Sequence, residues 1–215
     1  MSNDLGERSF AAVIFDMDGT LVDSTPAVVR SWMTWAQERG IPAERLLGWH
    51  GVPAASIVSA LVPPEEVDDA LARITELEVG DVADIVVLPG VLDAFDALVG
   101  AHFAIATSCT RDLADARIGA AQLPSPEVVV TVDDVTHGKP DPEPFLTAAA
   151  RLGVDPADCL VVEDAPMGLQ AARSAGCATL AVTTTTPAEE LDADLVVADL
   201  SQVRFEVTDG RIRVQ

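Results

Sequence analysis

The stretch VIFDMDGTLVDS, residues 13–24, decides the fold and the chemistry predicted for this 215-residue chain. Its first residues complete an apolar run, Phe10–Phe15, of the kind that forms a buried strand. Asp16 and Asp18 follow this run directly, with Gly19 after them. Ligands of open α/β sheets bind beyond the carboxyl ends of the strands, so two carboxylates here can meet a cation and a phosphate together. The alternative is an acidic turn, because Asp and Gly are ordinary turn residues.

Similar apolar runs recur along the chain and alternate with helical patterns. Short, continuous apolar strands suit a parallel sheet that is covered on both faces. Their alternation with helices predicts an α/β fold with a doubly wound, Rossmann-like parallel sheet. The expected strands are Phe10–Phe15, Phe103–Ala106, Val128–Val132, Leu160–Val162, Thr179–Val182 and Leu195–Val197, and the expected helices span about 89–99, 110–121, 142–151 and 165–175.

The first crossover is much longer than the later ones, and its sequence is helical throughout. Ser24 and Pro26 resemble a helix cap and a first-turn proline, which start a helix that ends at Arg39 before Gly40. A second helix is expected over Ala54–Leu61, and a third begins near Pro63–Glu66. We therefore expect an α-helical cap subdomain over residues 22–86, inserted into a core formed by residues 1–21 and 87–215. The alternation around Asp209-Gly210 predicts a C-terminal β-hairpin.

Composition and charge exclude several classes of protein. Hydrophobic residues make up 49% of the chain, which is enough to bury a core, and the formal net charge is −22. Such a charge repels nucleic acid and anionic membranes, so neither is an expected partner, and it favours a soluble monomer. Cys109, Cys159 and Cys177 are odd in number and lack CxxC spacing, which argues against disulfides or structural zinc and fits a reducing compartment. Met1–Ser9 is polar, so we expect neither a signal peptide nor a membrane helix but a cytoplasmic protein.

The complete string over residues 13–24 resembles, nearly residue for residue, the first motif of the haloacid dehalogenase-like hydrolase superfamily. Three further motifs occur in the order found there, and the resemblance covers about residues 10–185. The chain resembles most closely the branch with a helical cap that contains sugar- and glycerol-phosphate phosphatases and β-phosphoglucomutases. The additional motifs are Thr107-Ser108 after the second core strand, Lys139 in GKPDP and Glu163-Asp164 in VEDAPMG.

This resemblance implies a catalytic role for each motif. Asp16 would be the nucleophile that forms an aspartyl-phosphate, and Asp18 would protonate the leaving alcohol and then activate water. Mg²⁺ would be held by the Asp16 side chain, the Asp18 main-chain carbonyl and Asp164, whose hard oxygen atoms suit this ion. Ser108, with backbone amides around Cys109, would bind the phosphoryl group, and Lys139 would offset its charge. We expect Glu163 to contact a metal-bound water, and Cys109 to be a packed residue and not a reactive thiol.

Three readings of the function stay open at this level. Asp18 favours a phosphatase or a phosphomutase over the dehalogenase, phosphonatase and ATPase branches, which lack Asp there. β-Phosphoglucomutase-like enzymes usually carry His twelve residues after the nucleophile, where this chain has Val28. In the cap, His50 and Gly51 resemble the His-Gly pair that contributes to substrate specificity in the glycerol- and deoxyglucose-phosphate phosphatases. Val52-Pro53, however, stand where basic residues are expected. We therefore favour a small sugar or polyol monophosphate as substrate; a non-catalytic module that binds a phosphate ligand is the remaining alternative.

Overall fold

Six parallel strands form the centre of the structure, a computed structural model that describes residues 5–47 and 52–215. Their order is β5-β4-β1-β6-β7-β8, so the chain winds outward in both directions from β1. This confirms the predicted doubly wound α/β sheet. The strands are β1 (Ala12–Phe15), β4 (His102–Ala106), β5 (Val128–Val130), β6 (Cys159–Glu163), β7 (Ala178–Val182) and β8 (Leu195–Val197).

The sheet is apolar on both faces because helices cover both. In β1, Val13 and Phe15 pack into one core cluster, whereas Ala12 and Ile14 pack into the other. All four residues are fully buried, which explains why the run is continuously apolar and does not alternate with polar residues. The first cluster includes residues of α4 (Val91–Ala97) and α5 (Arg111–Ala120), and the second includes residues of α6 (Glu143–Leu152) and α7 (Pro166–Ser174).

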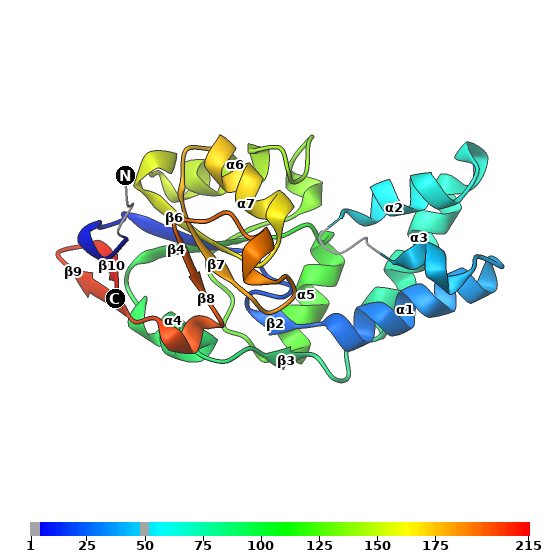
Figure 1. Ribbon diagram of the computed structural model, residues 1–215, viewed down its shortest axis with the longest axis horizontal. Helices are drawn as coiled ribbons and strands as arrows, with labels where there is room; N and C mark the ends of the chain where they lie inside the picture. The colour runs from blue at the N-terminus through cyan, green and yellow to red at the C-terminus, as the bar shows by residue number, and fades with distance from the viewer. Residues whose placement is uncertain (1–4, 48–51) are drawn as a thin grey trace.

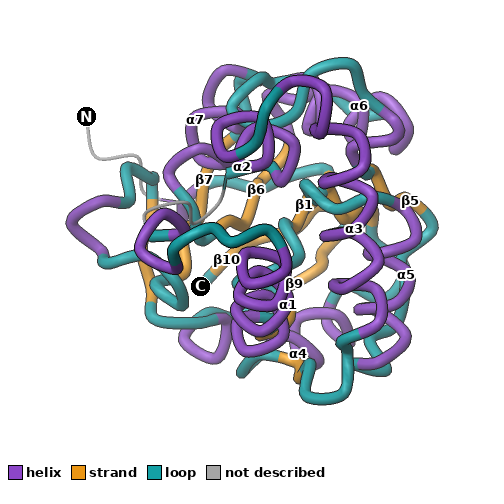
Figure 2. Tube along the Cα trace, turned by 90° about the vertical axis from the view of Figure 1, so that its right-hand side faces the viewer, coloured by secondary structure: helices purple, strands orange, loops and turns teal. Residues whose placement is uncertain are grey.

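Three helices inserted between β1 and α4 lie to one side of the sheet in Figure 1 and face the viewer in Figure 2. They are α1 (Thr25–Glu38), α2 (Ala54–Leu61) and α3 (Val67–Gly80), close to the ranges predicted from the sequence. The insert has a core of its own, in which the Trp35 ring nitrogen donates a 2.8 Å hydrogen bond to the Ala70 carbonyl. Apolar residues of all three helices are buried there, so the insert supports its own packing.

The start of α1 differs in detail from the expectation. Ser24 occupies the cap position, but its side chain accepts no capping hydrogen bond. The Asp23 carboxylate accepts the Thr25 amide instead, at 3.0 Å, while Pro26 lies in the first turn as predicted. Pro26, the second residue of the helix, has no amide hydrogen, which removes one of the two amides that a Ser24 side chain could cap.

A short two-stranded ribbon carries the chain into and out of the insert. β2 (Val22–Asp23) pairs antiparallel with β3 (Val86–Val87), and the Leu88 amide donates to the Leu21 carbonyl at 2.9 Å. This ribbon was not predicted, because strands of two residues leave no periodic signal in the sequence.

The predicted C-terminal hairpin is confirmed. β9 (Phe205–Thr208) pairs antiparallel with β10 (Arg211–Val214), and Asp209 and Gly210 between them both have positive φ, as a type I′ turn requires. Within the described parts of the chain, no helix has the length and apolar character needed to cross a membrane.

Candidate active site

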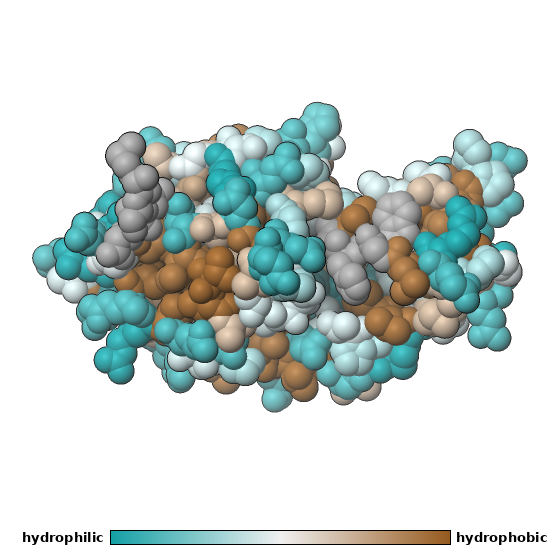
Figure 3. All heavy atoms as spheres, in the orientation of Figure 1, coloured by the Kyte–Doolittle hydropathy of each residue, from teal (hydrophilic) through white to brown (hydrophobic). Residues whose placement is uncertain are grey.

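A cavity of about 950 Å³ lies between the carboxyl ends of the central strands and the helical insert. Figure 3 shows the surface indented between these two parts of the molecule. The core residues that line the cavity include most of those singled out in the sequence, among them Asp16, Asp18, Ser108, Cys109, Lys139, Glu163 and Asp164. The fold thus brings together side chains that are far apart in the chain. His50 and Gly51, the predicted specificity residues of the cap, lie outside the described residues.

A tight turn after β1 holds Asp16 and Asp18 at the cavity wall. The Asp16 amide continues the sheet ladder by donating to the Val162 carbonyl at 2.9 Å. The chain then turns at Gly19, whose φ of +84° is readily adopted only by glycine. A Cβ atom at this position would overlap the Asp164 carboxylate, so the glycine also lets the turn approach the end of β6.

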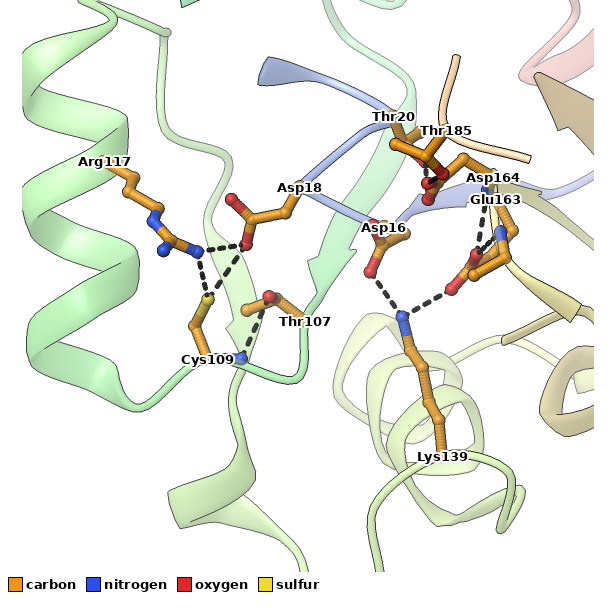
Figure 4. A network of polar contacts seen from close by, with 11 residues as sticks. Asp16, Asp18, Thr20, Thr107, Cys109, Arg117, Lys139, Glu163, Asp164 and Thr185 are labelled. Carbon is orange, nitrogen blue, oxygen red and sulfur yellow. Dashed lines mark hydrogen bonds and ion pairs between the residues drawn. The ribbon is translucent and has the colours of Figure 1, made fainter. Parts of the chain in front are cut away.

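Lys139 is the buried cation at the centre of the site (Figure 4). Its Nζ lies 2.5 Å from Asp16 Oδ1 and 2.8 Å from Glu163 Oε1. Burial by itself would lower the pKa of Lys139, but the Asp16 and Glu163 carboxylates outweigh burial and raise it. Lys139 therefore stays charged and fixed between the two carboxylates.

Glu163 anchors this arrangement from the end of β6. Its second oxygen, Oε2, accepts the backbone amides of Asp164 and Ala165, each at 2.8 Å. Both carboxylate oxygens of Glu163 are thus engaged by protein groups, one by Lys139 and one by the backbone. A contact with a metal-bound water, expected from the sequence, stays a prediction.

Asp16, Glu163 and Asp164 form a buried acidic cluster whose oxygen atoms lie within 4.8 Å of one another. Burial, opposed by Lys139 and reinforced by Glu163 and Asp164, raises the pKa of Asp16 well above its usual value. Burial and then Glu163 raise the pKa of Asp164 to about 7. One lysine cannot neutralise three carboxylates, and hard oxygen donors suit Mg²⁺, so the cluster fits a divalent cation of this kind.

Two threonines orient Asp164 within this cluster. The Thr20 hydroxyl donates to Asp164 Oδ1 at 3.2 Å, and the Thr185 hydroxyl donates to Oδ2. Thr185 lies in the loop after β7 and was not predicted as a site residue. Its place in the sequence is a run of threonines, Thr183–Thr186, that carries no recognisable motif.

Asp18 belongs to a separate group of contacts on the other side of Asp16 from Asp164 (Figure 4). Its Oδ2 accepts from Arg117 Nη1 at 2.8 Å and from the Cys109 thiol at 2.9 Å. Burial, followed by the Asp18 charge, raises the pKa of Cys109, so its thiol stays protonated. The Cys109 amide, expected to face phosphate, donates here to the Thr107 hydroxyl at 3.1 Å.

Arg117 and Glu78 complete this group, and sequence reasoning missed both of them. Arg117 Nη2 lies 3.2 Å from Glu78 Oε1, which belongs to α3 of the insert. The sequence did contain a signal for Arg117. It lies at helical spacing with Leu113, Ala114 and Ile118, on the face of α5 that is otherwise apolar and buried.

Comparison with known proteins agrees with this geometry. Residues 13–182 match the family described as haloacid dehalogenase-like hydrolase. Hexitol phosphatase A of Escherichia coli is 39% identical over 197 residues, which cover 88% of this chain and 91% of the relative. Glycerol-1-phosphate phosphohydrolase 1 of Saccharomyces cerevisiae is 31% identical, covering 90% of this chain and 84% of the relative. The crystal structure of a hydrolase from Pseudomonas syringae superposes with a TM-score of 0.79 at 29% identity, covering 88% of this chain and 94% of that one.

Proposed function

Because this chain belongs to the haloacid dehalogenase-like hydrolase family and is a phosphoric monoester hydrolase, we propose that it removes phosphate from small sugar or polyol monophosphates with Mg²⁺ as cofactor. The observation that carries the proposal is the placement of Asp16 against Lys139, at the carboxyl end of β1 and facing the cavity. A carboxylate held by a buried cation in this position can attack a bound phosphate.

The reaction proceeds in two displacements. An Asp16 oxygen forms a bond to phosphorus while the bond from phosphorus to the ester oxygen breaks, and Asp18 gives its proton to the departing alcohol. Asp18 then takes a proton from a water molecule, whose oxygen attacks the aspartyl-phosphate, releases inorganic phosphate and restores Asp16. Lys139 favours the ionised form of Asp16 and opposes the effect of burial on its pKa.

The phosphoryl group is held by the residues that follow β4. Ser108 lines the cavity directly after that strand, next to Cys109. The Ser108 hydroxyl donates to a phosphoryl oxygen, and Lys139 offsets the charge of the phosphoryl group; the Cys109 amide is engaged by the Thr107 hydroxyl. Positioning and charge stabilisation of this kind account for most of the catalysis of phosphoryl transfer.

Asp16, Asp164 and the main-chain carbonyl of Asp18 are the groups that would hold Mg²⁺. The fit rests on the excess of buried negative charge at Asp16, Glu163 and Asp164 and on the oxygen-only donor set. When bound, Mg²⁺ offsets the charge of Asp16 and of the substrate phosphate.

The insert, which we delimit as a cap at residues 22–86 on a core of residues 1–21 and 87–215, sets the size and polarity of the substrate. Described cap residues that line the cavity include Val28, Trp32, Val52, Ile57 and Leu71, and no lysine or arginine of the described cap residues is among them. This lining favours a substrate with one phosphate and a small uncharged body. The names of the two relatives, which refer to a hexitol and to glycerol 1-phosphate, favour the same class of substrate.

Val28 argues against a phosphomutase. It lies on α1 and lines the cavity, where a mutase of the resembling kind usually presents histidine. Valine cannot move a proton. The intact set of Asp16, Asp18, Lys139 and Asp164 likewise argues against a non-catalytic module.

The decisive experiment measures phosphate release from hexitol, glycerol, sugar and glycolate phosphates, with Mg²⁺ or EDTA, for the wild type and Asp16→Asn. We expect turnover that needs Mg²⁺ and disappears in the variant, with hexitol and glycerol phosphates among the best substrates. Conversion of a sugar 1-phosphate to its 6-phosphate in the presence of a bisphosphate, without phosphate release, would establish a mutase instead.

A further inference from the structure

Arg117 connects the helical insert to the proposed general acid. Its guanidinium is buried and bridges Asp18 Oδ2, at 2.8 Å, and Glu78 Oε1, at 3.2 Å. Asp18 belongs to the core turn after β1, Arg117 to α5 and Glu78 to α3, which packs against α5. One ion network thus joins three elements across the boundary between core and insert.

Stability alone does not account for this network. Taking three charged groups out of water is costly, and a buried ion pair is often no more stable than apolar residues of the same volume. The neighbouring positions Leu113, Ala114 and Ile118 of α5 are apolar. An apolar side chain at position 117 would extend the apolar face of α5 and avoid the cost of burying a charge. The presence of arginine therefore indicates that its charge has a role.

The two oxygens of Asp18 have different surroundings. Oδ2 is held by two donors, Arg117 Nη1 and the Cys109 thiol. Oδ1 is buried and has no hydrogen-bond partner among the described residues. One oxygen is therefore anchored while the other has no partner among the described residues, and Asp18 lines the cavity that would hold the ester oxygen.

We propose that Arg117 is a positioning residue that anchors Asp18 Oδ2 so that Oδ1 serves the leaving alcohol, and that Glu78 makes this anchoring depend on the insert. The inference rests on the proposed function, because it assigns Asp18 the role of acid. Glu78 fixes the second nitrogen of the guanidinium, so Arg117 keeps its orientation only while α3 packs on α5. Proton transfer to the alcohol is thereby confined to the state in which the insert covers the cavity.

The test compares two esters that differ in their need for an acid. Glycerol 1-phosphate releases a poor leaving group that must be protonated, whereas 4-nitrophenyl phosphate releases a phenolate that is stable as an anion. General acid catalysis contributes about 10²–10⁴-fold to rates. For Arg117→Gln we expect kcat/KM on glycerol 1-phosphate to fall at least about tenfold more than on 4-nitrophenyl phosphate. A merely structural role would lower both values equally.

Glu78→Gln tests the link to the insert and retains Arg117 if Arg117→Gln fails to fold. It should shift the ratio of the two kcat/KM values in the same direction by a smaller factor. In the double variant with Arg117→Gln, the ratio should equal that of Arg117→Gln alone. The matched control is Arg30→Gln, which removes an arginine that bridges Asp81 and Asp84 away from the cavity and should leave the ratio unchanged. An unchanged ratio in a folded Arg117→Gln or Glu78→Gln variant overturns the inference. A wild type inactive on both esters overturns the proposed function itself.

Discussion

Gly168 leaves the space that the Glu163 carboxylate occupies. A Cβ atom at position 168, in the first turn of α7, would overlap both the carbon and the oxygens of that carboxylate. Since Glu163 Oε1 lies 2.8 Å from Lys139 Nζ, the missing side chain at 168 determines where Lys139 is held beside Asp16. The glycine in the EDAPMG motif thus has a steric purpose, and a positive φ is not the reason for it.

Gly168→Ala should therefore lower activity without touching any group that binds substrate. The added methyl displaces Glu163 and with it Lys139, and overpacking of this kind costs about 1–3 kcal/mol of unfolding free energy. We expect kcat to fall by about tenfold, since small misplacements of reacting groups are costly. Steady-state kinetics and urea denaturation measure the two effects.

The matched control for this substitution is Gly119→Ala in α5, where an added Cβ meets nothing within 4 Å. Alanine in an exposed helical position should stabilise the protein by about 0.5–1 kcal/mol and leave kcat unchanged. Equal kinetics for Gly168→Ala and the wild type would show that Glu163 does not determine the position of Lys139.

Lys139→Met should abolish turnover and destabilise the fold. It leaves Asp16 and Glu163 buried without their cation, and breaking a buried pair by removing one partner costs about 3–5 kcal/mol. Adding Glu163→Gln removes one of the two uncompensated carboxylates, so the double variant should recover part of the stability but none of the activity. A single variant as stable as the wild type would contradict the assigned charges.

Mg²⁺ should stabilise the folded protein through the acidic cluster. A ligand present at about 100 times its Kd adds about 2.7 kcal/mol to the unfolding free energy, so the melting temperature should rise on adding MgCl₂ and fall back with EDTA. Asp164→Asn should remove this response. Asp141→Asn is the control, because Asp141 is an exposed carboxylate that does not line the cavity, so its loss should leave the response of the buried cluster unchanged.

The dependence of stability on pH should differ between the wild type and Glu78→Gln. Burial, opposed by Arg117 and reinforced by Asp18, raises the pKa of Glu78 above its ordinary 4.5. The folded protein then holds this proton more tightly than the unfolded chain does. The stability that results is fully present below pH 4.5 and is lost as the pH rises through the raised pKa.

Glutamine stays neutral throughout, so Glu78→Gln should gain stability relative to the wild type as the pH increases from about 4 to 8. Urea denaturation of both proteins at each pH measures the difference. A difference that stays constant, or changes in the opposite direction, would show that Arg117 outweighs the effect of burial on Glu78.

Much of the molecule was predictable because the relevant signals are local. The apolar runs that became β1, β4, β6 and β7 are continuous, since strands covered on both faces have no polar side to show. Asp16 directly follows β1, and parallel strands deliver their carboxyl ends to one edge of the sheet, so a site could be expected there. The assignment of Ser108, Lys139 and Asp164 to the same site came from the resemblance to the hydrolase superfamily, and all four residues line one cavity.

The contacts of Arg117 and Glu78 could not be predicted, although both residues are in helices that were. A helical pattern identifies the face that is buried, but not the residue on another helix that it meets. Arg117 and Glu78 are 39 positions apart and meet because α3 packs against α5, while Asp18 reaches Arg117 from the turn after β1. The same holds for Thr185, which reaches Asp164 from the loop after β7.

The sequence by itself thus determined the doubly wound sheet and the helical insert, because hydrophobic periodicity is a property of short segments, and its resemblance to the hydrolase superfamily named the candidate members of the site. Only the tertiary structure decided which groups orient those members: Gly168 beside Glu163, and Glu78 beside Arg117. The physical reason is that burial and ion pairing depend on distances between segments, which the packing of helices on the sheet creates and no local pattern encodes.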